Sequence, residues 1–304
     1  MHIGISSPIV IAHPSMCADW ERDAGIAELA RIAETADRLG FHHLTCSEHV
    51  AVPVDSAAER GGTYWDPLAT FGFLAARTSG IRLATQVLVL GYHHPLEIAK
   101  RYGTLDLVSG GRLILGLGVG SLREEFDLLG AEFAERGARA DEALAALRAA
   151  LSVDRPEYHG RYFDFENMLV RPHAVQPRVP LWIGGRTRRS LRRAAEFGDG
   201  WVPFGLALGE VRAMLKSVEL PAGFELVLGA GQPLDPIGAP DRTAQALDRL
   251  RAAGTTIASV GLTATGAADY CDRLAALRTL ATELGCTFDD RPGPPPENTP
   301  AWSR

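Results

Sequence analysis

The hydrophobic positions of the chain follow two periods, one typical of β-strands and one typical of α-helices. Short segments are apolar at every second position or throughout, and the longer segments between them are apolar every three to four positions. The pattern predicts strands at 2–11, 42–47, 81–90, 113–117, 179–183, 200–204, 224–229 and 256–262. It predicts helices at 21–39, 66–80, 95–108, 136–151, 187–197, 209–218, 241–253 and 270–284.

The order of these elements indicates the fold class. Strands and helices alternate along the chain, which is the pattern of an α/β protein with a parallel sheet. Eight such units in a chain of this length favour a closed (β/α)8 TIM barrel with loop insertions. An open doubly wound sheet is the alternative, because one missed strand would change the count.

The barrel is expected to occupy residues 1–288 as a single domain. Residues 158–170 are expected to form an insertion with short strands of their own. Residues 289–304 contain the run PGPPP, which suits neither a helix nor a strand, so we expect a flexible, disordered tail there.

Composition narrows the classes of function. The 304 residues are 46% hydrophobic and 22% charged, as in ordinary globular proteins. The net charge of −6 disfavours a general binder of nucleic acid or of acidic membranes. No run reaches the ~18 apolar residues of a membrane span. The apolar N-terminus has no Lys or Arg ahead of it, which makes it a poor signal peptide.

Cysteine usage indicates the compartment and argues against a metal centre. The cysteines are scattered without a CxxC pair, at Cys17, Cys46, Cys271 and Cys286. A chain of this size needs no disulfides, and the spacing suits no zinc site. We therefore expect a cytoplasmic protein and no bound metal.

The active site of a barrel of this kind lies at the carboxyl ends of its strands. That rule selects the segments 47–49, 90–94, 116–125, 184–187 and 203–205.

The segment after the fifth predicted strand is the most informative of these. Gly184 and Gly185 let the backbone approach a ligand closely, and a helix start with free N–H groups follows at once. Arg186 adds positive charge. Because a helix dipole contributes only about 0.3–1 kcal/mol, the amides and the arginine must do most of the holding. The pattern predicts a phosphate or carboxylate site, and a tight turn before a solvated helix is the alternative.

The histidines at the strand ends are candidates for acid–base chemistry. His49 follows Glu48 directly, so the two are read either as an acid–base pair or, for His49, as a donor to a ligand. A hydrogen-bonded core histidine is the alternative. His93 and His94 lie just before a predicted helix and are candidate caps for it.

The segment 116–121 is rich in glycine but carries GxGxG rather than GxGxxG, which is a weak indication of a nucleotide site. The alternative is that its small residues relieve crowding at the barrel mouth, meaning the end of the barrel where the strands terminate.

Taken together, these segments resemble the luciferase-like monooxygenase family, and within it the branch that uses the deazaflavin coenzyme F420. The resemblance runs from about His2 to Leu284 and rests on motifs that stand in the family's order. These motifs are ADRLGFHHLTCSEHV (36–50), HPLEIAKRYGTLDLVSGGRLILGLGVG (94–120), REEFDLLG (123–130), ERGARADE (135–142), RPHAVQPRVPLWIGG (171–185) and AAEFGDGWVP (194–203).

The resemblance implies a binding mode for the coenzyme. Its ring would lie in the mouth against strands 2 to 4, in front of a non-proline cis peptide at Gln86-Val87. Its phosphate would be held by the segment 184–186. The residues implied to bind the coenzyme are Gln86, Val87, Val119, Gly120, Ser121, Gly184, Gly185 and Arg186.

Two positions depart from the family pattern. Glu48 stands where the family usually has Asp, and Ser121 stands where some deazaflavin dehydrogenases carry an acidic residue. The second departure argues against a sugar-phosphate dehydrogenase.

The resemblance implies an oxidoreductase that moves a hydride between F420 and a small organic substrate. His49 and Glu48 would be its catalytic residues, with His49 as proton donor or ring-orienting group. An FMN-dependent monooxygenase using reduced flavin and oxygen, and a non-catalytic flavin-binding protein, are the alternatives. A metal-dependent barrel hydrolase is disfavoured, because strand 1 has Ser6 and Ser7 in place of HxH. The implied partners are a flavin or F420 reductase and a second copy of the chain.

Overall fold

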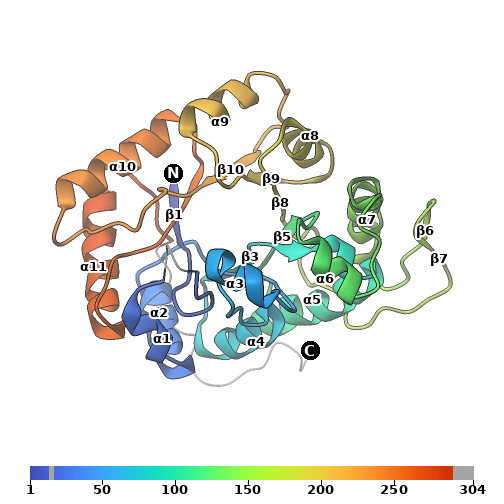
Figure 1. Ribbon diagram of the computed structural model, residues 1–304, viewed down its shortest axis with the longest axis horizontal. Coiled ribbons are helices and arrows are strands. Elements are labelled where there is room, and N and C mark those ends of the chain that lie inside the picture. Colours follow the sequence, from blue (N-terminus) through green and yellow to red (C-terminus); the bar gives the residue numbers. More distant parts are fainter. Residues whose placement is uncertain (14–16, 290–304) are drawn as a thin grey trace.

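The strands of the computed structural model form a closed parallel barrel, which confirms the predicted (β/α)8 fold (Figure 1). The structure describes residues 1–13 and 17–289. The barrel strands are β1 (His2–Ile5), β2 (His43–Cys46), β3 (Arg82–Thr85) with β4 (Leu88–Val89), β5 (Leu113–Gly118), β8 (Leu181–Gly184), β9 (Gly200–Val202), β10 (Glu225–Leu228) and β11 (Ile257–Val260). Each pairs in parallel with the next, and β1 pairs with both β2 and β11, which closes the barrel.

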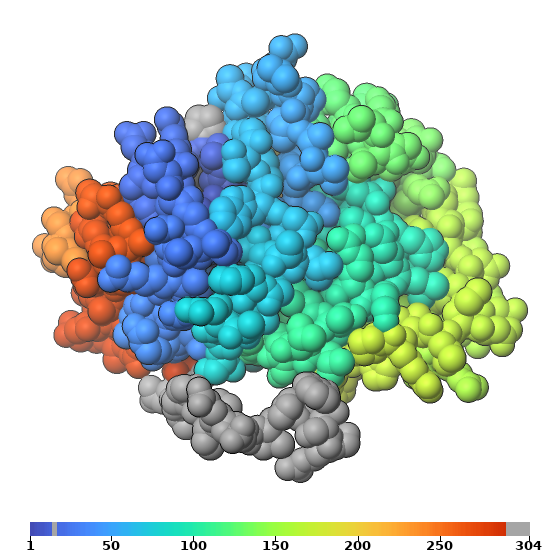
Figure 2. All heavy atoms as spheres, turned by 90° about the horizontal axis from the view of Figure 1, so that it is seen from below, coloured from blue at the N-terminus to red at the C-terminus, as the bar shows by residue number. Residues whose placement is uncertain are grey.

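Helices surround the strands and form the outer layer (Figure 1). They are α1 (Asp19–Asp23), α2 (Ile26–Arg38), α3 (Val54–Arg60), α4 (Pro67–Arg77), α5 (Pro95–Ser109), α6 (Arg123–Leu128), α7 (Arg136–Ala150), α8 (Arg188–Phe197), α9 (Leu208–Leu215), α10 (Pro240–Ala252) and α11 (Ala267–Glu283), with a 3-10 turn η1 at Leu90–Tyr92. Figure 2 shows α11, α2, α4 and α5 side by side on one face of this layer. Among the described residues, no helix combines the length and the apolar composition that crossing a bilayer would need.

Several helix boundaries follow from capping groups that the sequence contains. Asp66 accepts a hydrogen bond from the amide of Ala69 at 2.8 Å, and Pro67 opens α4 without an orphan donor. His94 caps α5 through its Nδ1, which accepts from the amide of Leu96 at 3.1 Å. The capping role considered for His94 is therefore confirmed.

Some predicted elements are divided differently in the structure. The helix predicted at 21–39 is two helices, because the Glu28 side chain caps the amide of Gly25 at 2.8 Å and starts α2 there. The strand predicted at 81–90 is broken between β3 and β4. Two short helices, α3 and α6, were not predicted, since neither is long enough to show a periodic stripe.

The insertion predicted at 158–170 contains the antiparallel pair β6 (Tyr158–His159) and β7 (Asp164–Phe165), as expected. At the C-terminal end, the amide of Asp289 donates to the Gly40 carbonyl at 3.0 Å. The remainder of the tail predicted at 289–304 lies outside the described residues.

The core has an outer and an inner part. The outer part lies between the helices and the outward faces of the strands, and holds most of the buried Leu, Ile and Ala side chains. The inner part fills the barrel with one side chain from each of six strands. Its members are Ala84, Ile114, Trp182, Val202, Val227 and Ile257. The barrel is thus a packed core, and the strand ends are left to form a site.

Candidate active site

The carboxyl ends of the parallel strands bring the selected segments together at the barrel mouth. Residues 47–49 follow β2, 90–94 follow β4, 119–125 follow β5 and 185–187 follow β8. Because β2 pairs with β3, and β5 pairs with β3, β4 and β8, these segments are neighbours around one half of the barrel. Segments more than 100 residues apart in the sequence therefore share one end of the fold.

His49 lies at the end of strand β2 and is held by two contacts. Its Nδ1 donates to Oε2 of Glu125 at 2.7 Å, and its ring packs edge-on against Tyr64 with centroids 4.5 Å apart. The side chain is 20% exposed. The predicted placement at the strand end is therefore found, with a carboxylate partner that the sequence interpretation did not identify.

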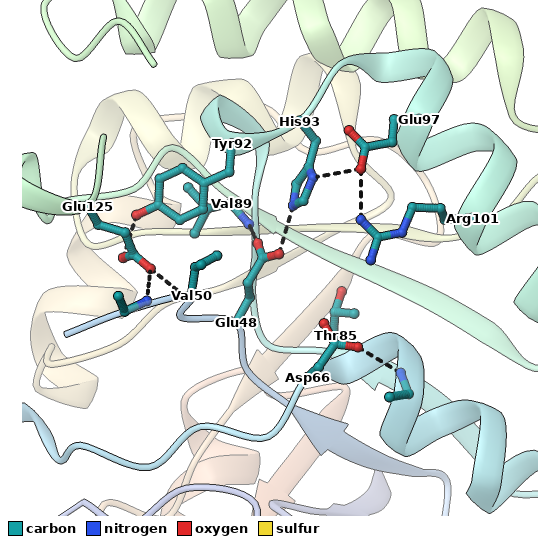
Figure 3. A network of polar contacts seen from close by, with 12 residues as sticks. Glu48, Val50, Asp66, Thr85, Val89, Tyr92, His93, Glu97, Arg101 and Glu125 are labelled. Carbon is teal, nitrogen blue, oxygen red and sulfur yellow. Dashed lines mark hydrogen bonds and ion pairs between the residues drawn. The ribbon is translucent and has the colours of Figure 1, made fainter. Parts of the chain in front are cut away.

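Glu125 is the residue that sequence reasoning missed. It comes from α6, is 1% exposed, and accepts four hydrogen bonds; Figure 3 shows those from Val50 and Tyr92. The donors are Val50 N at 2.5 Å, Ala51 N at 3.2 Å, Tyr92 Oη at 2.6 Å and His49 Nδ1 at 2.7 Å. The selected segment 116–125 includes this residue, but its helix is too short to mark an inward-facing position.

The ionisation of this cluster follows from its contacts. Burial alone would raise the pKa of Glu125, but the hydrogen bonds from His49, Tyr92 and Val50 outweigh it, and the pKa is lowered. Burial, the hydrogen bond to Glu125 and the nearby charge of that residue all raise the pKa of Tyr92. The cluster therefore holds an ionised carboxylate beside a neutral phenol.

Glu48 does not pair with His49, so the acid–base pair considered from their adjacency is wrong. Oε2 of Glu48 accepts from Val89 N at 2.7 Å, and Oε1 accepts from Nε2 of His93 at 2.7 Å (Figure 3). The two neighbouring side chains thus have different partners, one after β4 and the other on α6. Glu48 is 8% exposed and ties the end of β2 to the segment after β4.

His93 continues this contact away from β2. Its Nδ1 lies 3.5 Å from Glu97, which also pairs with Arg101 at 2.8 Å. Burial would lower the pKa of His93, but the hydrogen bond and charge of Glu48 outweigh it, so the pKa is raised. His93 is thus a partner of Glu48 and does not cap α5.

The break between β3 and β4 lies at Gln86-Val87, where the resemblance implies a cis peptide. The Gln86-Val87 peptide is cis, which confirms that expectation. A Cβ atom at Gly118 would lie 2.6 Å from a Val87 methyl, and one at Gly184 would lie 2.8 Å from the other. These glycines therefore make room for Val87, which is the crowding explanation considered for the GxGxG segment.

The segment after β8 has the features expected of an anion site. Gly185 has φ +135°, and Arg186 is exposed with no carboxylate partner among residues 1–13 and 17–289. Thr187 caps α8 through the amide of Ser190 at 3.2 Å, and the amides of Arg188 and Arg189 have no intrahelical acceptor. Two amides are thus available to an anion, together with a guanidinium that has no carboxylate partner and lies 5.9 Å from the centroid of the Phe204 ring.

The other residues implied to bind the coenzyme lie in the same region. The carbonyl of Gln86 accepts from Ser47 Oγ at 2.5 Å. Gly120 has φ +76°, and its carbonyl accepts from Arg136 Nε at 3.3 Å. Val119 is half-buried and Ser121 is exposed, both just after β5. Their roles toward a coenzyme stay predictions.

One cluster outside the mouth has the residue types of a metal site. Glu157, His159 and Glu166 are exposed and have potential ligand atoms within 4.8 Å of one another. Both ring nitrogens of His159 already lie near carboxylates, at 2.7 Å from Asp164 and 3.1 Å from Glu157. The histidine of this cluster therefore already has carboxylate partners on both ring nitrogens, and the cluster lies apart from the site at the barrel mouth.

Comparisons with known proteins point to one family. The sequence model of the family described as luciferase-like monooxygenase matches residues 1–225. An uncharacterised protein of Mycobacterium tuberculosis is 31% identical over 276 residues, which is 84% of this chain and 94% of the relative. A second uncharacterised protein of that organism is 30% identical over 186 residues, 57% of this chain, and the match spans 64% of that relative's length.

Relatives with a stated activity are more distant. The chain is 29% identical over 214 residues to the F420-dependent glucose-6-phosphate dehydrogenase of Nakamurella multipartita, covering 69% of this chain and 61% of that protein. The structure of monooxygenase RslO1 from Streptomyces bottropensis superposes with a TM-score of 0.74 at 24% identity, over 94% of this chain and 100% of that one. An F420-dependent secondary alcohol dehydrogenase with an F420-acetone adduct gives 0.73 at 14% identity, over 92% and 97%. These two likenesses show the fold.

Proposed function

Because the chain belongs to the luciferase-like monooxygenase family, whose members use a flavin or F420, we propose that it is an oxidoreductase that uses F420. The reaction would transfer a hydride between the deazaflavin and a small organic substrate. A separate reductase would supply the reduced coenzyme where the substrate is to be reduced.

One observation carries the choice of coenzyme. A relative with a stated activity, which matches this chain by sequence over 69% of the chain's length, is F420-dependent. We do not propose the substrate of that relative for this chain. Ser121 stands where the resemblance implies an acidic residue in some deazaflavin dehydrogenases.

The chain's own residues fit a phosphate-bearing coenzyme. Gly185 leaves the backbone open, while the first-turn amides of α8 and the exposed Arg186 supply hydrogen-bond donors and positive charge. The glycines at 118 and 184 seat Val87, so the cis peptide is held at the mouth by packing from β5 and β8. These features support a binding site for an anionic group beside a shaped wall.

When bound, the coenzyme supplies the hydride chemistry, and the protein orients it and manages protons. His49 is the group at the mouth suited to hold or move a proton, because one imidazole nitrogen can accept a proton while the other donates a hydrogen bond. Glu48 is buried and holds the segment after β4 through Val89 and His93, so its role is to position that wall.

The alternative is an FMN-dependent monooxygenase, which the family's own description favours. The two are separated by an oxygen-uptake assay with FMN, a flavin reductase and NADH. F420 dependence predicts no uptake beyond that of the reductase alone. Uptake that depends on this protein, or FMN retained through purification, would establish the alternative.

A further inference from the structure

We propose that Glu125 is a positioning residue that fixes the tautomer of His49, so that the ring gains and loses its proton at Nε2 alone. The inference deepens the proposed function and rests on it in one respect, since the proton matters only if His49 serves the coenzyme or substrate. The tautomer itself is a property of the protein without coenzyme, so it can be tested separately.

The hydrogen bonds of Glu125 leave no freedom in the carboxylate. Oε1 accepts from the amides of Val50 and Ala51, and Oε2 accepts from Tyr92 Oη and His49 Nδ1. A backbone amide can only donate, so the side of the carboxylate that faces Val50 and Ala51 must be an oxygen. The other oxygen is thereby directed at the histidine.

An ionised carboxylate can only accept hydrogen bonds. Glu125 is 1% exposed, and the hydrogen bonds from His49, Tyr92 and Val50 keep it in the charged form. The nitrogen of His49 that faces it must therefore carry the proton, whether the ring is neutral or charged. Tyr92 does not compete for this role, because its phenol stays neutral and donates to the same oxygen.

The second nitrogen of the ring is the one left for chemistry. Nε2 of His49 has no hydrogen-bond partner among the described residues. It is not one of the fully buried polar atoms that lack a partner, so it keeps some contact with solvent. The side chain is 20% exposed, and Tyr64 packs against the ring edge-on. Neutral His49 thus offers a lone pair at Nε2, which is what a proton acceptor needs.

Replacing the carboxylate by an amide is expected to reverse this arrangement. Glu125→Gln has one oxygen, and the amides of Val50 and Ala51 require it. The NH2 group then faces His49 and donates to Nδ1, while the Tyr92 hydroxyl turns and accepts from it. His49 becomes the Nε2–H tautomer, so its free nitrogen changes from an acceptor to a donor.

The test is nitrogen NMR of histidine-labelled protein without coenzyme, at mildly alkaline pH, with the His49 signals identified by their loss in His49→Asn. Wild type should show Nδ1 protonated, and Glu125→Gln should show Nε2 protonated. Glu124→Gln, an exposed change on the same helix, and Tyr92→Phe should both keep the wild-type pattern. A wild-type ring with Nε2 protonated overturns the proposal, and this result does not depend on whether Glu125→Gln folds. An unchanged tautomer in folded Glu125→Gln also overturns it.

Kinetics provide the second readout. Glu125→Gln should lower turnover by about 10²-fold or more, as loss of a general acid or base does. In a His49→Ala background the same change should cost no more, because Glu125 acts through the ring. Independent, additive losses would contradict the proposal. Failure of F420 to bind would remove the proposed function and leave the NMR result decisive for the tautomer.

Discussion

Two adjacent residues at the end of β2 show how the mouth is organised residue by residue. Glu48 pairs with His93 and His49 pairs with Glu125, and in both pairs the buried carboxylate also accepts from at least one backbone amide. A carboxylate fixed by amides has one orientation, so the histidine opposite it is fixed as well. The mouth is therefore preorganised by buried carboxylates that no substrate needs to touch.

The first prediction concerns His49 itself. His49→Ala should lower turnover, followed by F420 absorbance, by about 10²–10⁴-fold, because it removes the one group at the mouth proposed to move a proton. His173→Ala, a half-buried histidine elsewhere, is the control. If coenzyme affinity falls while saturated turnover survives, His49 only orients the ring. If neither changes, it is a packing residue.

The second prediction concerns Arg186. Arg186→Ala should weaken coenzyme binding by roughly tenfold to a hundredfold, since a charge-assisted hydrogen bond contributes about 1.5–3 kcal/mol. Arg192→Ala removes the same charge from an exposed position further along the chain, within α8, and should change little. Equal affinity of wild type and Arg186→Ala in a fluorescence titration, with the fold intact, rules out the anion site.

At the scale of elements, the break between β3 and β4 is coupled to glycines on two other strands. Val87 occupies space that side chains at Gly118 and Gly184 would fill, and a Cβ at Gly116 would lie 1.9 Å from the Thr85 carbonyl. Gly118 and Gly184 are thus spatial partners of one valine, and Gly116 makes room for the backbone just before the break. They explain why a glycine-rich strand end appears here without a nucleotide motif.

This coupling gives the third prediction. Gly118→Ala should destabilise the protein by about 1–3 kcal/mol in urea unfolding, because the new methyl overlaps a Val87 methyl. Val87→Ala removes that methyl, so the double variant should be more stable than the two separate losses predict. Strictly additive losses would show that the two residues do not meet in this way.

The sequence predicted the elements well where a long periodic stripe or a cap marked them. The bounds of α5 and α11 and the parallel order of the strands follow from such patterns. Short elements such as α6 have no periodicity, so the position of Glu125 was not predicted. Adjacency in sequence was misleading for Glu48 and His49, because each side chain binds a partner that lies far away in the sequence.

At the scale of the whole molecule, one buried histidine makes the stability of the barrel depend on pH. His43 on β2 is fully buried, its Nε2 is 3.2 Å from Ser259 Oγ, and its Nδ1 shares a hydrogen bond with His42 at 3.0 Å. A Cβ atom at Gly4 would overlap the ring of His43, so the glycine in β1 leaves the space that this ring fills. Burial lowers the pKa of His43 to about 3 from 6.5, and the ring stays neutral in the folded protein.

The fourth prediction is the effect of this residue on acid stability. Unfolded chains bind a proton at this histidine below about pH 6.5 and the folded protein does not, so stability falls as the pH drops from there toward about 3. Between about pH 7 and pH 5 the loss from His43 is about 2 kcal/mol. His43→Asn should reduce that pH dependence in urea unfolding, whatever its effect at neutral pH. The same slope in wild type and His43→Asn, with His173→Asn as control, would contradict the assignment.

The central claim, that the barrel mouth is built for a deazaflavin, is tested most directly by one titration. Purified protein is titrated with F420 and, separately, with FMN, and binding is followed by coenzyme fluorescence. The account predicts micromolar or tighter binding of F420 and much weaker binding of FMN. Tight binding of FMN with little or no binding of F420 would contradict it.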